Sequence, residues 1–200
     1  MAGIKYTIRQ NRLNKALFQG MKLEADGSVH TEETADSSYL VLPLLDSGVE
    51  DCPWGRLHFE LALEENSVCY LYVASCNART GQEMMLDASV PLLEKKHLLQ
   101  SLGGLQFINK PDVLLYEITG RFLWIVVELL GEKAALWNIQ VEAPGDNFMQ
   151  TFPEVYREKN SFFHRYLSIY SSLYNDFQEK LDSRGELLPI EKAPMELLEV

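Results

Sequence analysis

Hydrophobic and polar residues alternate in the middle of the chain. In the segment 54–66, every second residue from 57 to 63 is apolar, and the residues between them are mostly charged or histidine. The apolar positions are Leu57, Phe59, Leu61 and Leu63, and the polar ones are Arg56, His58, Glu60 and Glu64. A period of two is typical of a half-buried strand. The segment 67–76, rich in β-branched and aromatic residues, follows directly, so the two segments predict a β-hairpin.

The segment 120–131, with the sequence GRFLWIVVELLG, is apolar on both faces. One face carries Phe122, Trp124 and Val126, and the other carries Leu123, Ile125, Val127 and Leu129. Such a strand is either covered on both sides within its own sheet structure or lies against another domain. Residues 136–142 predict a strand that returns beside it.

Short strands separated by turn residues predict an antiparallel β-sandwich. Further strands are expected at 15–24, which ends at an Asp-Gly turn, and at 38–45. Residues 86–104 predict a short helix or a structured loop. Because Pro144 and Gly145 interrupt the β pattern, we expect the sandwich to occupy residues 1–143.

Helical periodicity begins beyond this boundary. Apolar residues recur at intervals of three and four over the segment 161–181, which predicts an amphipathic helix. A second helix is predicted to begin at Pro194, and it ends in mid-pattern at Val200, which indicates a truncated or unusually short version of a longer protein. The predicted fold is therefore α+β, with an N-terminal antiparallel β-sandwich followed by a small helical region at 144–200.

Charge and composition narrow the possible partners. The chain has 29 acidic and 18 basic residues and a net charge of −11, which argues against binding to nucleic acid. No apolar run approaches the ~20 residues that span a bilayer, and the first residues lack the apolar stretch of a signal peptide. We therefore expect a protein made in the cytoplasm, with neither nucleic acid nor membrane as a partner.

The common catalytic and metal-binding motifs are missing from the sequence. Cys52, Cys69 and Cys76 lack CxxC spacing, so packing in the core is the main interpretation, with a disulfide or a metal or nucleophile role as alternatives. The basic segment 94–97, EKKH, is interpreted as a solvated face or turn. The glutamate pair at 64–65 is interpreted as a turn rather than as paired catalytic carboxylates. We expect no enzyme activity, catalytic residue, cofactor or metal.

Aromatic residues form a stripe on the predicted 161–181 helix. They are Phe163, Tyr166, Tyr170, Tyr174 and Phe177, with Phe162 at the edge. About 22 residues form a rod of roughly 33 Å, which the short helix after Pro194 cannot cover. Because interface cores are enriched in aromatic residues, part of this stripe is expected to bind another subunit.

The segment 151–160, TFPEVYREKN, joins the two parts of the chain. Pro153 fixes φ and prevents a continuous helix, and Phe152 and Tyr156 are expected to anchor the segment on apolar surface. The planar guanidinium of Arg157 suits a carboxylate on a partner. A local capping and charge arrangement within one chain explains the segment equally well.

The order of these segments resembles the phage tail protein I family, the small wedge component of contractile-tail baseplates and phage-like injection systems. The matching elements are Phe152-Pro153, Val155-Tyr156-Arg157, the 161–181 helix and Ala193–Glu196. The upstream sequences GRFLWIVVEL and VEAPGD resemble a strand and a linker of larger members. The resemblance covers about 110–200 well and 1–109 loosely. Members usually continue past this point with a tryptophan-rich helical segment, and this chain stops first.

The resemblance implies a structural subunit that bridges neighbouring baseplate wedge proteins, especially the larger wedge subunit, through its C-terminal helices. Such a subunit is made in the bacterial cytoplasm and joins a phage tail, a tail-like bacteriocin or a contractile injection system. The alternative is a carbohydrate-binding β-sandwich module, a fold analogy in which Trp54, Tyr70, Tyr72 and Trp124 stack on sugars. An exposed aromatic shelf near acidic or amide side chains would favour this alternative, and burial of all four residues would exclude it.

Overall fold

The computed structural model describes residues 4–32, 38–115, 117–131 and 133–143, together with Pro153 and nine positions between 162 and 177. The chain divides into two units. One unit is Gly3–Gly145, and the other is Met1–Ala2 with Asp146–Val200.

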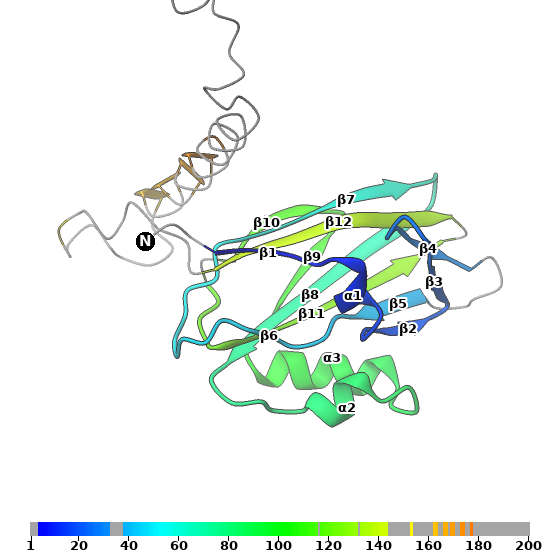
Figure 1. Cartoon of the computed structure of the whole chain (residues 1–200), viewed down its shortest axis with the longest axis horizontal. Helices are drawn as coiled ribbons and strands as arrows, with labels where there is room; N and C mark the ends of the chain where they lie inside the picture. Colours follow the sequence, from blue (N-terminus) through cyan, green and yellow to red (C-terminus); the bar gives the residue numbers. More distant parts are fainter. Residues whose placement is uncertain are drawn as a thin grey trace, which may run out of the picture. The chain divides into compact units, whose positions relative to one another are not determined.

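Two antiparallel sheets pack face to face in the unit Gly3–Gly145 (Figure 1). The first sheet has the order β10 (Asp112–Leu114), β7 (Arg56–Leu63), β12 (Ala134–Ala143), β4 (Val29–Thr31) and β3 (Met21–Leu23), and β1 (Ile4–Thr7) also pairs with β12. The second has the order β2 (Leu17–Gln19), β5 (Ser38–Val41), β11 (Phe122–Leu130), β8 (Val68–Cys76) and β9 (Leu105–Ile108), and β6 (Leu45–Asp46) also pairs with β11. The predicted antiparallel β-sandwich is confirmed.

The inward-facing apolar positions of both sheets form the main core. In β7, Leu57 and Phe59 are at most 1% exposed, whereas Glu60, on the opposite face of the strand, is exposed. This alternation confirms the strand that the period of two predicted. The short helix α1 (Gln10–Leu13) adds Leu13 to the same core.

A second, smaller core lies on the outer side of the second sheet. In β11, the odd-numbered side chains from Leu123 to Leu129 face the main core, and Trp124 and Val126 face the opposite way. There they are covered by α2 (Gln82–Leu86) and α3 (Leu92–Ser101), which Figure 1 shows against this sheet. The strand is therefore covered on both sides, as one of the two sequence interpretations stated. Of the two predictions for 86–104, the helix is confirmed.

The predicted hairpin between 54–66 and 67–76 is wrong. β7 pairs with β10 and β12 in the first sheet, whereas β8 pairs with β9 and β11 in the second. The turn between them, with Asn66 at a φ of 69°, carries the chain from one sheet to the other. β12 likewise does not pair with β11, because the turn at Gly131 (φ 117°) crosses between the sheets. The predicted strand 15–24 is divided in the same way, since β2 and β3 belong to different sheets.

The prediction of a solvated face at 94–97 holds for Glu94 and His97, which are exposed, and is wrong for Lys95. Lys95 is fully buried, and its Nζ donates hydrogen bonds to the carbonyl oxygens of Met85 (3.0 Å) and Asp87 (2.7 Å). Burial lowers the pKa of the Lys95 ammonium. This lysine therefore holds α3 against the end of α2.

Lys96 forms a largely buried ion pair with the second sheet. Its Nζ lies 2.6 Å from Oε2 of Glu128 in β11, and the hydroxyl of Tyr72 in β8 donates to the same oxygen over 3.1 Å. Glu128 is 7% exposed. The pair therefore fastens α3 to the two central strands of the second sheet.

Candidate functional site

The residues predicted to join the two parts of the chain are described only at one position. Pro153 is exposed, and Phe152, Tyr156 and Arg157 lie outside the described residues. A partner contact by Arg157 stays a prediction.

Large apolar side chains are exposed along the predicted 161–181 helix. The nine described positions of this segment between 162 and 177 are helical. The exposed ones are Phe162 (85%), Tyr166 (57%), Ile169 (48%), Tyr170 (54%), Leu173 (57%), Tyr174 (47%) and Phe177 (60%). At about 100° per residue, these seven side chains, here called the aromatic face, fall within an arc of roughly 140°.

The aromatic face contains four of the five residues of the predicted stripe. The fifth, Phe163, is half-buried, and Leu167 beside it is 8% exposed. The rings of Phe162 and Tyr166 stack with their centroids 6.4 Å apart. Phe162, expected at the edge of the stripe, is the most exposed of the seven. Aromatic side chains of this kind are enriched in the cores of protein interfaces.

The four aromatic residues suggested for sugar stacking do not form a surface shelf. Trp54 and Trp124 are at most 1% exposed and Tyr72 is 9% exposed. Tyr70 is half-buried, and its ring stacks on that of Tyr72 with a centroid separation of 6.4 Å. Trp54, Trp124 and Tyr72 are therefore core residues, and a sugar has no access to their faces.

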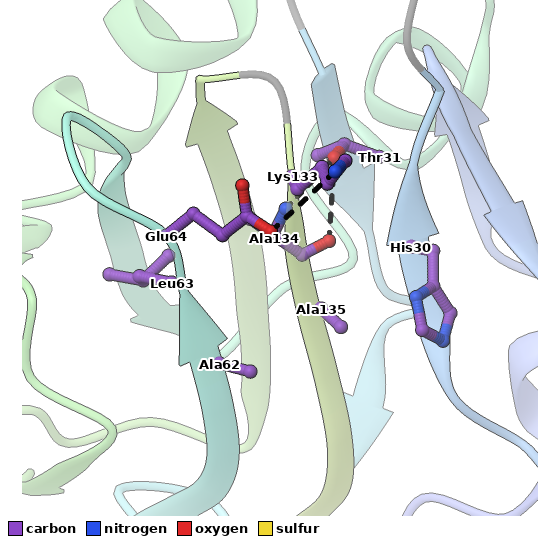
Figure 2. A pocket seen from close by; sticks show the side chains of 8 residues that line it. All are labelled: His30, Thr31, Ala62, Leu63, Glu64, Lys133, Ala134 and Ala135. Carbon is purple, nitrogen blue, oxygen red and sulfur yellow. Dashed lines mark hydrogen bonds and ion pairs between the residues drawn. The ribbon is translucent and has the colours of Figure 1, made fainter.

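The outer face of the first sheet carries a groove that the sequence analysis missed. Its volume is about 280 Å³, and Figure 2 shows its lining residues, which are His30, Thr31, Ala62, Leu63, Glu64, Lys133, Ala134 and Ala135. Ala62 of β7 pairs directly with Ala135 of β12, and His30 of β4 pairs with Ala135 from the other side. At one end, Nζ of Lys133 lies 3.8 Å from the carboxylate of Glu64. The floor is thus made of small side chains and the ends of polar ones.

Trp137 of β12 lies on the same face as Ala135, and a β-bulge begins directly after it. The pairing of β12 with β7 shifts between Trp137, which faces Glu60, and Gln140, which faces His58. Asn138 within the bulge has a φ of 54°. As a result Trp137 and Asn138 are both exposed, and Ile139 returns to the core with 2% exposure. Bulges re-aim side chains in this way and occur often near functional sites.

A chain of hydrogen bonds holds the exposed indole of Trp137. Its Nε1 donates to Oε2 of Glu60 over 2.8 Å, and Nδ2 of Asn138 donates to Oε1 of the same carboxylate over 3.0 Å. Nε2 of Gln140 donates to Oδ1 of Asn138 over 2.8 Å. We call the groove together with Trp137, Glu60, Asn138 and Gln140 the outer-face site. A tryptophan at a polar position of an alternating strand was the signal that could have indicated it.

A serine, a histidine and an aspartate meet at the turn before β4, but not as a catalytic triad. The hydroxyl of Ser28 lies 2.6 Å from Oδ1 of Asp26 and 2.8 Å from Nε2 of His30. In a triad the carboxylate orients the histidine. Here it accepts from the hydroxyl and the backbone N–H of Ser28, and these bonds lower the pKa of Asp26. The arrangement stabilises the turn.

The cysteines are free thiols. Cys52 and Cys69 are buried, as predicted for small core residues, and Cys76 is half-buried. Burial raises the pKa of the Cys69 thiol to about 12, so it stays protonated and unreactive. Within the described part of the chain, no three His, Cys, Asp or Glu side chains are grouped to hold a metal ion.

The Gly120-Arg121 pair, part of the sequence that carried the family resemblance, has a structural role. Gly120 has a φ of 151°, and a Cβ there would lie 2.8 Å from the backbone nitrogen of Cys76. Arg121 donates from Nε and Nη2 to the two carboxylate oxygens of Asp46, over 2.7 and 3.1 Å. These contacts fix the beginning of β11 against β8 and β6.

The Asp46–Arg121 pair should make stability depend on pH in acid. The hydrogen bond from Arg121 lowers the pKa of Asp46 from 3.8 to about 2. A lowered carboxyl pKa stabilises the fold above the ordinary value, and this contribution is lost as the pH falls toward the folded-state pKa. We expect Asp46→Asn to be less stable than the wild type in urea unfolding at neutral pH, with the difference shrinking between about pH 4 and 2. A difference that stays constant across this range would contradict the assignment.

No helix among the described residues is long and apolar enough to cross a bilayer.

Comparisons with known proteins include a distant structural similarity. No family model matches the chain, and no curated protein matches it. A chain of the Glycosylation Associate Protein (Gap123) complex from Streptococcus agalactiae is similar with a TM-score of 0.35 and 10% identity, over 72% of this chain and 26% of that chain. This chain thus spans about a quarter of the length of that one. A similarity of this size carries no argument about function.

Proposed function

We propose that this chain is a structural, non-enzymatic subunit of a multiprotein assembly and that its aromatic face binds a neighbouring subunit. The observation that carries the proposal is the exposure of seven large apolar side chains, from 47% to 85%, in one arc of a helix. The resemblance to the phage tail protein I family suggests the assembly, a baseplate wedge of a contractile tail or injection system. The larger wedge protein is then the partner.

The size of the aromatic face supports binding of a protein rather than a small ligand. Burying one large apolar side chain contributes roughly 1.5–3 kcal/mol. Association costs on the order of 4–15 kcal/mol in lost freedom of motion. Several such side chains must therefore be buried together for a stable complex, and the arc of seven provides them. Monomers seldom expose a contiguous apolar patch larger than a few hundred Å².

A variant with a less apolar helix should bind its partner more weakly. We expect Tyr166→Ser combined with Phe177→Ser to weaken binding to the larger wedge protein by about 30-fold or more, since even one central aromatic residue can contribute about 2 kcal/mol to an interface. Isothermal titration or co-elution on size exclusion measures the change. Both positions are 57–60% exposed, so the sandwich should keep its stability.

The matched control is Ile108→Ser in β9, which removes a side chain that is 52% exposed from the sandwich instead. The affinity of this variant for the larger wedge protein should equal that of the wild type. If the wild-type chain fails to co-elute with the larger wedge protein of the same particle, the baseplate assignment is wrong. If it co-elutes and the double variant binds equally well, the partner contacts another surface.

A further inference from the structure

We propose that the outer-face site binds a neutral saccharide. This inference concerns the first sheet of the sandwich and goes beyond the assembly role of the helix. It differs from the sugar-stacking alternative raised by the sequence, because it uses Trp137 and the groove rather than Trp54, Tyr70, Tyr72 and Trp124.

The exposed indole of Trp137 provides a stacking surface. The side chain is 36% exposed, and its Nε1 is held by Glu60 over 2.8 Å. The face of an aromatic ring carries partial negative charge. One face of a pyranose ring presents C–H bonds with partial positive charge, so the two surfaces attract each other. A ring that is already fixed in place also loses little side-chain entropy on binding.

The polar groups beside Trp137 match vicinal hydroxyls. An ionised carboxylate offers about four acceptor positions, and Trp137 and Asn138 use one on each oxygen of Glu60. Roughly two positions remain for hydroxyl donors. The amides of Asn138 and Gln140 donate one N–H each within the network and keep a second N–H. Sugar hydroxyls both donate and accept, and this mixture of groups serves both.

The groove can accommodate the sugar ring. Ala62 and Ala135 form its floor, two residues along each strand from Glu60 and Trp137 and on the same face. Small side chains there let a ring approach the sheet closely. Figure 2 shows the two alanines on neighbouring strands, with His30 on the strand beyond Ala135. The volume of about 280 Å³ is near the lower limit of small-molecule sites, which suits one or two sugar units.

Charge favours a neutral ligand. Glu60 and Glu64 both lie at the site, and the whole chain has a net charge of −11, so an anionic ligand would be repelled. Each carboxylate already has a donor or cation nearby, since Glu60 accepts two hydrogen bonds and Glu64 lies 3.8 Å from Lys133. A cationic ligand would therefore gain less here than at a free carboxylate.

The backbone supports a functional interpretation of the bulge. Asn138 adopts a left-handed conformation, which is uncommon outside glycine and often occurs at binding sites. The conformation turns Trp137 and Asn138 to the same side of the sheet, where a regular strand would expose only one of them.

Tryptophan fluorescence can test the site directly. The chain has three tryptophans, and Trp54 and Trp124 are buried, so acrylamide in solution should quench mainly Trp137. We expect a neutral sugar that binds here to protect Trp137 from quenching. The probes are glucose, galactose, N-acetylglucosamine and their common disaccharides at millimolar concentration, each tested with the full chain.

The variant Ala62→Leu fills part of the groove while Trp137 itself is kept, and we expect loss of the protection. Ala88→Leu makes the same change at an exposed position after α2 and should retain it. The proposal is overturned if no neutral sugar protects the wild type, or if Ala62→Leu remains folded and is protected equally well. Protection by tetramethylammonium but by no sugar would also overturn it, since the site would then bind a cation.

Discussion

Replacing Trp54 with alanine should lower the free energy of unfolding by about 3–5 kcal/mol, the range for removing a large buried aromatic side chain. Trp54 is 1% exposed in the main core, and its Nε1 donates to Oγ of Ser75 (3.0 Å) and to the carbonyl oxygen of Gly120 (2.8 Å). The variant loses the packing and leaves these two acceptors without their donor. Because domains are stable by only about 5–15 kcal/mol, a large part of the total would be lost. Urea unfolding followed by circular dichroism measures the change in the free energy of unfolding.

Trp137→Ala is the matched control, because it removes the same side chain from a position that is 36% exposed. Its effect on unfolding should be much smaller than that of Trp54→Ala. Equal losses in the two variants would show that Trp54 is not the core residue that its burial indicates.

Replacing Lys96 with methionine should cost about 3 kcal/mol, the lower end of the range for removing one partner of a buried ion pair. Glu128 would keep its charge in a strand where it is 7% exposed, with only the hydroxyl of Tyr72 as a donor among the contacts described. We place the loss at the lower end because the Lys96 side chain is 21% exposed and water can reach the site. Urea unfolding at neutral pH measures the loss.

The double variant Lys96→Met with Glu128→Gln separates charge from packing. It removes both charges, and the glutamine oxygen can still accept from Tyr72. We expect it to recover most of the lost stability, because a neutral replacement of a buried pair is often tolerated. If the double variant is as unstable as Lys96→Met, the loss comes from the packing of the lysine stem, and the ion pair contributes little.

Sequence alone predicted which side of a strand is buried but not which strand lies beside it. The alternation at Leu57 and Phe59, and the two apolar faces of the segment 120–131, both follow from local residue order and both hold in the structure. Pairing depends on where the chain crosses between the sheets. Among the described strands, four pairs of successive strands cross between the sheets at short turns: β2 and β3, β7 and β8, β9 and β10, and β11 and β12. The predicted neighbours of β7 and β11 were therefore wrong.

The buried lysines and the outer-face site depend on tertiary contacts in the same way. The charge of Lys96 is accommodated by Glu128, which lies 32 residues away in the chain. Trp137 becomes part of a site only because β7 brings Glu60 opposite it and a bulge turns Asn138 outward. A local pattern shows a tryptophan at a polar position, but it does not show these contacts. The aromatic face differs, because one helix determines it and its periodicity is visible in the sequence.

The position of β12 has a consequence for the order of events during synthesis. β12 is the last strand in the chain order of the described residues, yet it lies between β7 on one side and β4 and β1 on the other. Until Ala134–Ala143 has left the ribosome, the first sheet can exist only as separate pieces, β10 with β7 and β4 with β3. Chains dominated by such long-range pairing fold slowly. We therefore expect a nascent chain that stalls before β12 to expose the apolar faces of both pieces. Such a chain would be bound by chaperones or degraded by proteases before it could join an assembly.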